Sequence, residues 1–106
     1  MTGAIDSNTW KLVGNTSGQS TLDLPSGFRE LLVVVTAVDA VVTSVIPREA
    51  LKSASQYFII GGGHNDNSYP GYYVNTSISL TKYYLTRVMI NNANYTSSSS
   101  SAVYYR

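Results

Sequence analysis

The residues best suited to chemistry lie in one glycine-rich segment, residues 61–68, which holds the only histidine of the chain, His64. Histidine is the side chain that titrates near neutral pH without perturbation. A catalytic base also needs a rigid support and a partner that orients it. His64 and Asp66 stand two residues apart on a segment whose composition predicts a loop. We therefore interpret His64 as a solvated loop histidine and not as a base.

The same segment offers oxygen ligands, because Asn65, Asp66 and Asn67 follow the histidine directly. Calcium loops use such side chains, but the D-x-[DN]-x-[DN]-G spacing and the closing Glu are missing here. A single acid supplies little charge for a divalent cation. The chain has no Cys, which excludes a thiolate metal site and a disulfide framework. We predict no metal and no cofactor.

No other motif in the chain predicts catalysis. There is no G-x-S-x-G elbow for a serine nucleophile. Most of the six acids fall beside turns or at strand ends, where solvated surface charge is the ordinary outcome. The Gly61-Gly62-Gly63 triplet precedes no helix pattern, so it does not predict a phosphate cradle. The expectation is that the protein is not an enzyme.

Tyrosines beside the loop suggest a binding surface instead. Aromatic faces can stack on sugar rings, and a surface rich in Tyr, Asn and Asp also resembles an antibody-type paratope. Two alternatives stay open: these rings cover the edge of the core with wet hydroxyls, or they contact another protein. The predicted ligand-binding residues are His64, Asn65, Asp66, Asn67, Tyr69, Tyr72 and Tyr73.

Adjacent tyrosines predict a second surface, because neighbouring side chains of a strand point to opposite faces. The pairs are Tyr72/Tyr73, Tyr83/Tyr84 and Tyr104/Tyr105, and each places one ring outward if its segment is a strand. Outward rings on several strands favour a ligand surface or a homo-oligomer interface. The residues predicted for an oligomer interface are Trp10, Tyr83, Tyr95, Tyr104 and Tyr105.

The elements that must position these residues are short strands. Alternating apolar residues separated by turn signals predict about eight of them, and no segment carries a long helical pattern. The predicted strands span residues 10–13, 21–24, 30–38, 41–46, 56–60, 77–80, 82–90 and 95–106. The run Leu31–Val35 reads as buried on both faces, and Tyr84, Thr86, Val88 and Ile90 are expected to share one face. We expect an all-β antiparallel sandwich or a jelly-roll-like domain.

The segments between and beside these strands give weaker patterns. Residues 69–74 contain Pro70 and Gly71, which favour an edge strand or a loop. The serine run 97–101 is expected to form part of a twisted edge strand or bulge. Residues 48–55 are expected to form a helical turn or loop with Leu51 inside. Residues 1–9 read as a flexible tail or linker, and residues 10–106 as one domain.

Composition limits the partners. Hydrophobic residues make up 43% of the 106 residues and charged residues only 12%, about half of the usual ~25%. The net charge is +1 and the basic residues form no run, so no nucleic-acid partner is expected. No apolar run reaches the ~18 residues of a spanning helix, so no membrane insertion is expected.

Several stretches resemble small β-sandwich domains of bacteriophage virions, such as those of tail-fibre, baseplate and accessory proteins. They are residues 10–14 (WKLVG), 21–25 (TLDLP), the Ile46-Pro47 turn and the ending 103–106 (VYYR). The resemblance implies a homo-oligomer, with a trimer favoured, located in the virion among other virion proteins. It also implies binding to a host-surface saccharide and no cofactor. The function expected is thus a virion structural or adhesion module. The alternative is a carbohydrate-binding module of a secreted bacterial enzyme or adhesin, located outside the cell.

Overall fold

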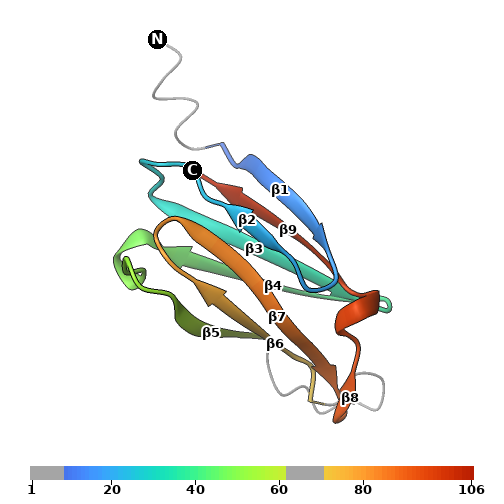
Figure 1. Ribbon diagram of the computed structural model, residues 1–106. Coiled ribbons are helices and arrows are strands. Elements are labelled where there is room, and N and C mark those ends of the chain that lie inside the picture. Colours follow the sequence, from blue (N-terminus) through green and yellow to red (C-terminus); the bar gives the residue numbers. More distant parts are fainter. Residues whose placement is uncertain (1–8, 62–70) are drawn as a thin grey trace.

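Two antiparallel sheets face each other across a shared apolar core (Figure 1). The computed structural model describes residues 9–61 and 71–106. Sheet A has the strand order β1-β9-β3-β4. Its strands are β1 Lys11–Ser17, β9 Ser100–Tyr105, β3 Glu30–Ala37 and β4 Ala40–Pro47. The all-β antiparallel sandwich expected from the sequence is therefore confirmed.

Sheet B has the order β2-β7-β6-β5, and the two-residue strand β8 also pairs with β7. Its strands are β2 Thr21–Asp23, β7 Lys82–Ile90, β6 Tyr73–Ile78, β5 Gln56–Gly61 and β8 Ala93–Asn94. Among the described residues, two short 3₁₀ helices lie outside the sheets, η1 (Arg48–Ala50) and η2 (Thr96–Ser98). No helix in residues 9–61 or 71–106 has the length and apolar character to cross a membrane.

The core forms between the inner faces of the sheets. Leu31, Val33 and Val35 of β3 are fully buried, as is Val103 of β9. Leu51, expected inside, is 6% exposed. The other face of β3 differs from the prediction, because Leu32 and Val34 are only half-buried. The apolar run of β3 is therefore covered on one face and partly open on the other.

A β-bulge corrects the predicted faces of β7. The register with β6 shifts between Asn75, which pairs with Arg87, and Thr76, which pairs with Leu85. The extra residue is Thr86, and inserting one residue reverses which side chains point inward. The buried residues of β7 are consequently Tyr83, Leu85, Val88 and Ile90.

Three placements differ from the sequence expectation. The first strand does not end at Gly14 but continues to Ser17 past a bulge between Leu12 and Gly14. Tyr73 and Val74 begin a central strand, β6, and not an edge. The serine run enters β9, which lies between β1 and β3 and is also central. Ser101 of β9 is buried and accepts a hydrogen bond from the Tyr83 hydroxyl, and Ser99, just before the strand, is buried with its hydroxyl donating to the Thr96 carbonyl.

Candidate assembly surface

The predicted ligand surface is only partly within the described residues. His64, Asn65, Asp66, Asn67 and Tyr69 lie outside them.

Tyr72 is described, and its ring is buried at 4% exposure. Its hydroxyl lies 3.1 Å from the Ala40 carbonyl oxygen and 3.3 Å from that of Val35, so it ties the β5–β6 region to sheet A. The structure does not support Tyr72 as a ligand-stacking ring, because the ring is buried as a member of the core. Tyr73 is half-buried on the outer face of sheet B.

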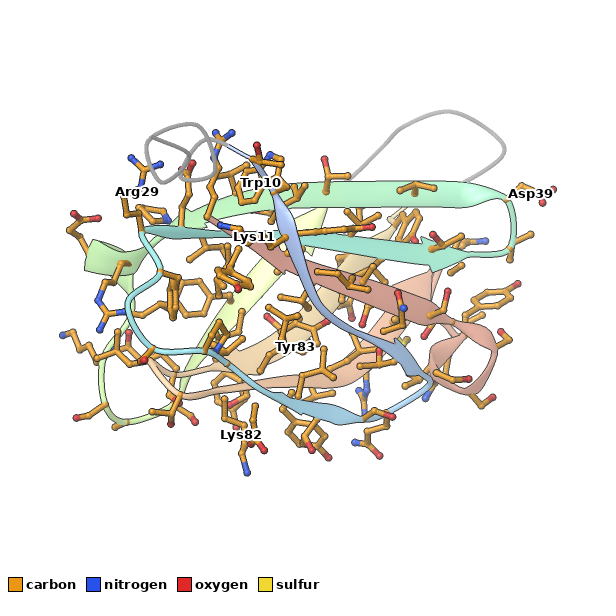
Figure 2. All side chains as sticks on the ribbon, turned by 90° about the horizontal axis from the view of Figure 1, so that it is seen from above. Trp10, Lys11, Arg29, Asp39, Lys82 and Tyr83 are labelled. Atoms are coloured by element: carbon orange, nitrogen blue, oxygen red, sulfur yellow. The ribbon has the colours of Figure 1, made fainter. Side chains whose placement is uncertain are left out.

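Tyr83 is also inside the sandwich, which corrects its place in the predicted oligomer interface. Its side chain is fully buried between the sheets, as Figure 2 shows, and its neighbour Tyr84 takes the outward position. The Tyr83 hydroxyl donates to the Ser101 hydroxyl at 3.1 Å, and Ser101 in turn bonds to Thr16. Desolvation by burial raises the pKa of Tyr83 to about 12, and the Ser101 bond opposes this rise. Tyr83 therefore bridges the two sheets as a neutral phenol.

The remaining members of the predicted interface divide between two environments. Tyr95 and Tyr105 pack partly against the core. Trp10 is half-buried next to Arg106, and Tyr104 is half-buried on the outer face of sheet A. Only Trp10 and Tyr104 thus contribute to a common outer surface.

The register of sheet A aligns four large side chains across all its strands. Leu12 of β1 pairs with Tyr104 of β9, Tyr104 with Leu32 of β3, and Leu32 with Val45 of β4. We call these four residues the apolar row. Leu12 is 52% exposed and Val45 51% exposed, while the two central members are half-buried. An uninterrupted apolar row across a solvent-facing sheet departs from the usual polar outer face of a sandwich.

Toward the β3–β4 turn, this outer face is uncharged along the register. The next residues toward the β3–β4 turn are Asn15, Ala102, Val34 and Thr43, followed by Ser17, Ser100, Thr36 and Val41. A shallow groove of about 290 Å³ lies over the β1, β9 and β3 part of these rows. Depletion of charge is the compositional mark of the centre of protein interfaces.

Charges occur at one end of the same face. Arg106 forms an ion pair with Glu30, and its guanidinium lies 4.1 Å from the centre of the Trp10 ring. The Arg106 carbonyl accepts the backbone N–H groups of Arg29 at 2.7 Å and Glu30 at 3.1 Å. Figure 2 shows Trp10, Lys11 and Arg29 at this end and Asp39 at the opposite end.

Basic residues that are far apart in the sequence lie together at this end, each stacked on an aromatic ring. Arg48 lies 5.0 Å from the Phe28 ring and Lys11 lies 5.9 Å from the Tyr105 ring, besides the Arg106 and Trp10 pair. Each cation covers apolar surface while its charge stays near water. We interpret this cluster as a cover for the open end of the core, since its cations are engaged with rings and with Glu30.

The outer face of sheet B has a smaller feature that the sequence did not reveal. Tyr57 is 81% exposed and Ile59 is 71% exposed. With Asn75 and Thr86 they line a groove of about 290 Å³. Nothing in the sequence around Tyr57 separates it from the other tyrosines, because only the sheet order shows that β5 is an edge with one strand neighbour among the described residues.

No group of three or more His, Cys, Asp or Glu side chains in the described part of the chain could hold a metal ion.

No family model, curated protein or solved structure matches this chain.

Proposed function

We propose that this domain is a non-catalytic assembly module that associates with copies of itself through the outer face of sheet A. The observation that supports this is the Leu31–Val35 run of β3, which is apolar on both faces although the sandwich covers only one. A second sheet packed on the apolar row would cover the other face, as sheets do at about 10 Å spacing. The absence of charge from the described centre of this face removes the main desolvation cost.

The free energy gained by burying the apolar row predicts an assembly that depends on protein concentration. Full burial of a large apolar side chain contributes about 1.5–3 kcal/mol. The residues of the apolar row are already half-buried or about half exposed, so each contributes roughly 1 kcal/mol on association. Two partners together reach roughly 8 kcal/mol, which lies within the 4–15 kcal/mol lost as rotational and translational freedom. A tight complex therefore needs contacts beyond the apolar row to increase the free energy of association.

The biological setting is part of the proposal and rests on the sequence resemblance. The protein would be a structural or adhesion module of a bacteriophage virion, assembled as an oligomer among other virion proteins. An extracellular setting is the alternative.

The test is the mass of the protein in solution, measured by light scattering over a range of concentrations. The wild-type protein is expected to exceed the 11.5 kDa of one chain. A face variant, Leu12→Lys with Tyr104→Glu, places opposite charges on a directly paired position, which preserves the sheet. Its mass should fall. Thr21→Lys on the exposed β2 serves as the control and should not change the mass.

A wild-type protein that remains at the mass of one chain, even at millimolar concentration, would rule out self-association. A face variant that folds, as shown by far-ultraviolet circular dichroism, but keeps the wild-type mass would rule out this face.

A second candidate function is carbohydrate binding on the outer face of sheet B. It is favoured by the exposed Tyr57 ring beside the amide of Asn75, a pairing suited to stacking on a sugar and bonding its hydroxyls. Tyr57→Ala should abolish glycan-array binding, whereas Tyr84→Ala, a half-buried tyrosine on the same sheet, should preserve it. Equal binding by the wild type and Tyr57→Ala would exclude this groove.

A further inference from the structure

We infer that β4 is a second contact, at which it pairs antiparallel with β4 of another copy and joins two A sheets edge to edge. The inference rests on the proposed self-association but uses a different surface. The face contact involves side chains on top of sheet A, whereas this contact involves the backbone at its side.

The four edges of the sandwich are protected unequally. Exposed edge strands are normally blunted by charges, bulges or short length. On one side, β1 has a bulge and Lys11, and β2 has three residues including Asp23. On the other side, β4 has eight residues, no charge, and an unbroken register with β3. One side of the sandwich therefore lacks the features that keep an edge free.

The neighbouring edge, β5, is uncharged as well but is shorter, at six residues. Its end, Gly61, comes so close to β4 that an added Cβ would lie 3.1 Å from a methyl carbon of Val42. β4 is thus the longer and more regular template on this side.

The backbone groups that face outward from β4 can be assigned. Arg48 N–H donates to the Arg29 carbonyl at 2.9 Å, directly beyond the β3–β4 ladder. Bonding alternates along an antiparallel pair, so the even-numbered residues of β4 bond to β3. The N–H and C=O groups of Val41, Thr43 and Val45 then point to the edge. Pro47 fits this assignment, since its missing N–H falls on the outward side. No strand among the described residues pairs with that edge.

The sequence of the edge suits a copy of itself. A two-fold axis at Thr43 places Val41 opposite Val45 of the partner strand, and Thr43 opposite its own counterpart. Opposed residues keep their faces, as antiparallel pairing requires, and β-branched and Thr–Thr pairs are favourable. No like charges meet. A symmetric dimer needs a surface that is complementary to itself, and this strand provides one.

The strength of the contact follows from its hydrogen bonds. Three outward residues in register give two bonds per pair, about six in all. Interfaces carry about one bond per 100–200 Å², so about six correspond to an interface of roughly 600–1,200 Å². Stable complexes bury at least ~1,000–1,200 Å². The edge contact is therefore weak alone and adds to the face contact.

The test is Thr43→Pro, compared with Thr43→Ala. The Thr43 N–H does not serve the β3–β4 ladder, so proline removes an outward donor and obstructs the partner strand while β4 stays in place. In light scattering, Thr43→Pro is expected to halve the mass of the wild-type assembly, because a two-fold contact is lost. Thr43→Ala, which keeps the N–H, should retain the full mass.

The outcomes separate the two proposals. A folded Thr43→Pro protein with the wild-type mass would overturn the edge contact and leave the face contact standing. A drop in mass with Thr43→Pro but not with the face variant would support the edge and overturn the face. A wild-type protein of single-chain mass would overturn both.

Hydrogen exchange of the wild-type protein keeps the inference testable if Thr43→Pro does not fold. Residue-resolved exchange is expected to show Val41, Thr43 and Val45 amides protected as strongly as those of Val42 and Ser44. Odd-numbered amides that exchange freely in the assembled protein, while the even-numbered ones are protected, would overturn the edge contact.

Discussion

The core contains a hydrogen-bonded group of three hydroxyls, those of Tyr83, Ser101 and Thr16. They join β7 of sheet B to β9 and β1 of sheet A. All three side chains are buried, and no side-chain polar atom that is both described and buried lacks a hydrogen-bond partner. Buried hydroxyls are tolerated only when they are paired in this way. The group therefore fixes how the two sheets align, at little net cost.

Tyr83 makes stability depend on pH in a defined direction. Its pKa of about 12 in the folded protein lies above the ordinary tyrosine value of 10.0, so folding favours the protonated form. This contribution is complete below pH 10 and is lost as the pH rises from 10 to 12. Each pKa unit corresponds to about 1.4 kcal/mol, so the loss is about 2–3 kcal/mol of unfolding free energy.

Tyr83→Phe should be less stable than the wild type at pH 8 by about 1 kcal/mol, because one hydrogen bond is removed. It should then lose less stability between pH 10 and pH 12 than the wild type. Urea unfolding at several pH values measures both effects. Parallel curves for the two proteins above pH 10 would contradict the assignment of this loss to Tyr83.

At the level of elements, the β3–β4 hairpin has an unusual turn. Val38, 56% exposed, has a φ of +56°. A β-branched residue is strained in this left-handed region, by roughly 1–2 kcal/mol. Turns of this kind prefer glycine or asparagine. The strain lies directly beside the edge strand for which we infer a partner.

Val38→Gly is expected to raise the free energy of unfolding by about 0.5–1 kcal/mol, because the relief of strain exceeds the entropy cost of glycine. The matched control is Val41→Gly, at a position 55% exposed but within β4. There glycine should lower stability by about the same amount. Thermal or urea unfolding distinguishes the two signs, and a destabilised Val38→Gly protein would show that the valine side chain contributes more than its strain costs.

The positions of the strands along the chain could be predicted from the sequence better than which strands pair with one another in the sheets. The strand at residues 82–90 has the predicted bounds, and β3 and β4 agree within one residue. Alternation reveals a strand because it follows from the two-residue period of the backbone. It does not reveal the bulge at Thr86, which puts Tyr83 on the same face as Val88 although uninterrupted alternation puts them on opposite faces, or the central position of β9. Both depend on which distant strand pairs where, and no local pattern records that. The exposure of Tyr57 was missed for the same reason.

At the scale of the whole molecule, the low net charge affects the association of one copy with another. The net charge of +1 gives little long-range repulsion between chains, and the rows inside the proposed face contain no charge. Salt therefore has few ion pairs to screen at this surface. In the mass experiment described above, about 1 M sodium chloride should leave the assembly intact. Dissociation by salt would instead indicate contacts through the Lys11, Arg29 and Arg48 end.

The central position of β9 also affects the rate of folding, because its two neighbours in the sheet, β1 and β3, lie far from it in the sequence. The β3–β4 hairpin and the β5–β6–β7 meander join neighbouring segments, but Thr16 of β1 and Ser101 of β9 are 85 residues apart in the chain. Distant pairings form slowly, on a millisecond-to-second scale in β-sandwiches. Until β9 inserts, β3 has a vacant side next to its most apolar run. Chains are most exposed to misassociation in the interval before β9 inserts, and folding at low concentration would reduce it because misassociation, unlike the insertion, needs two chains to meet.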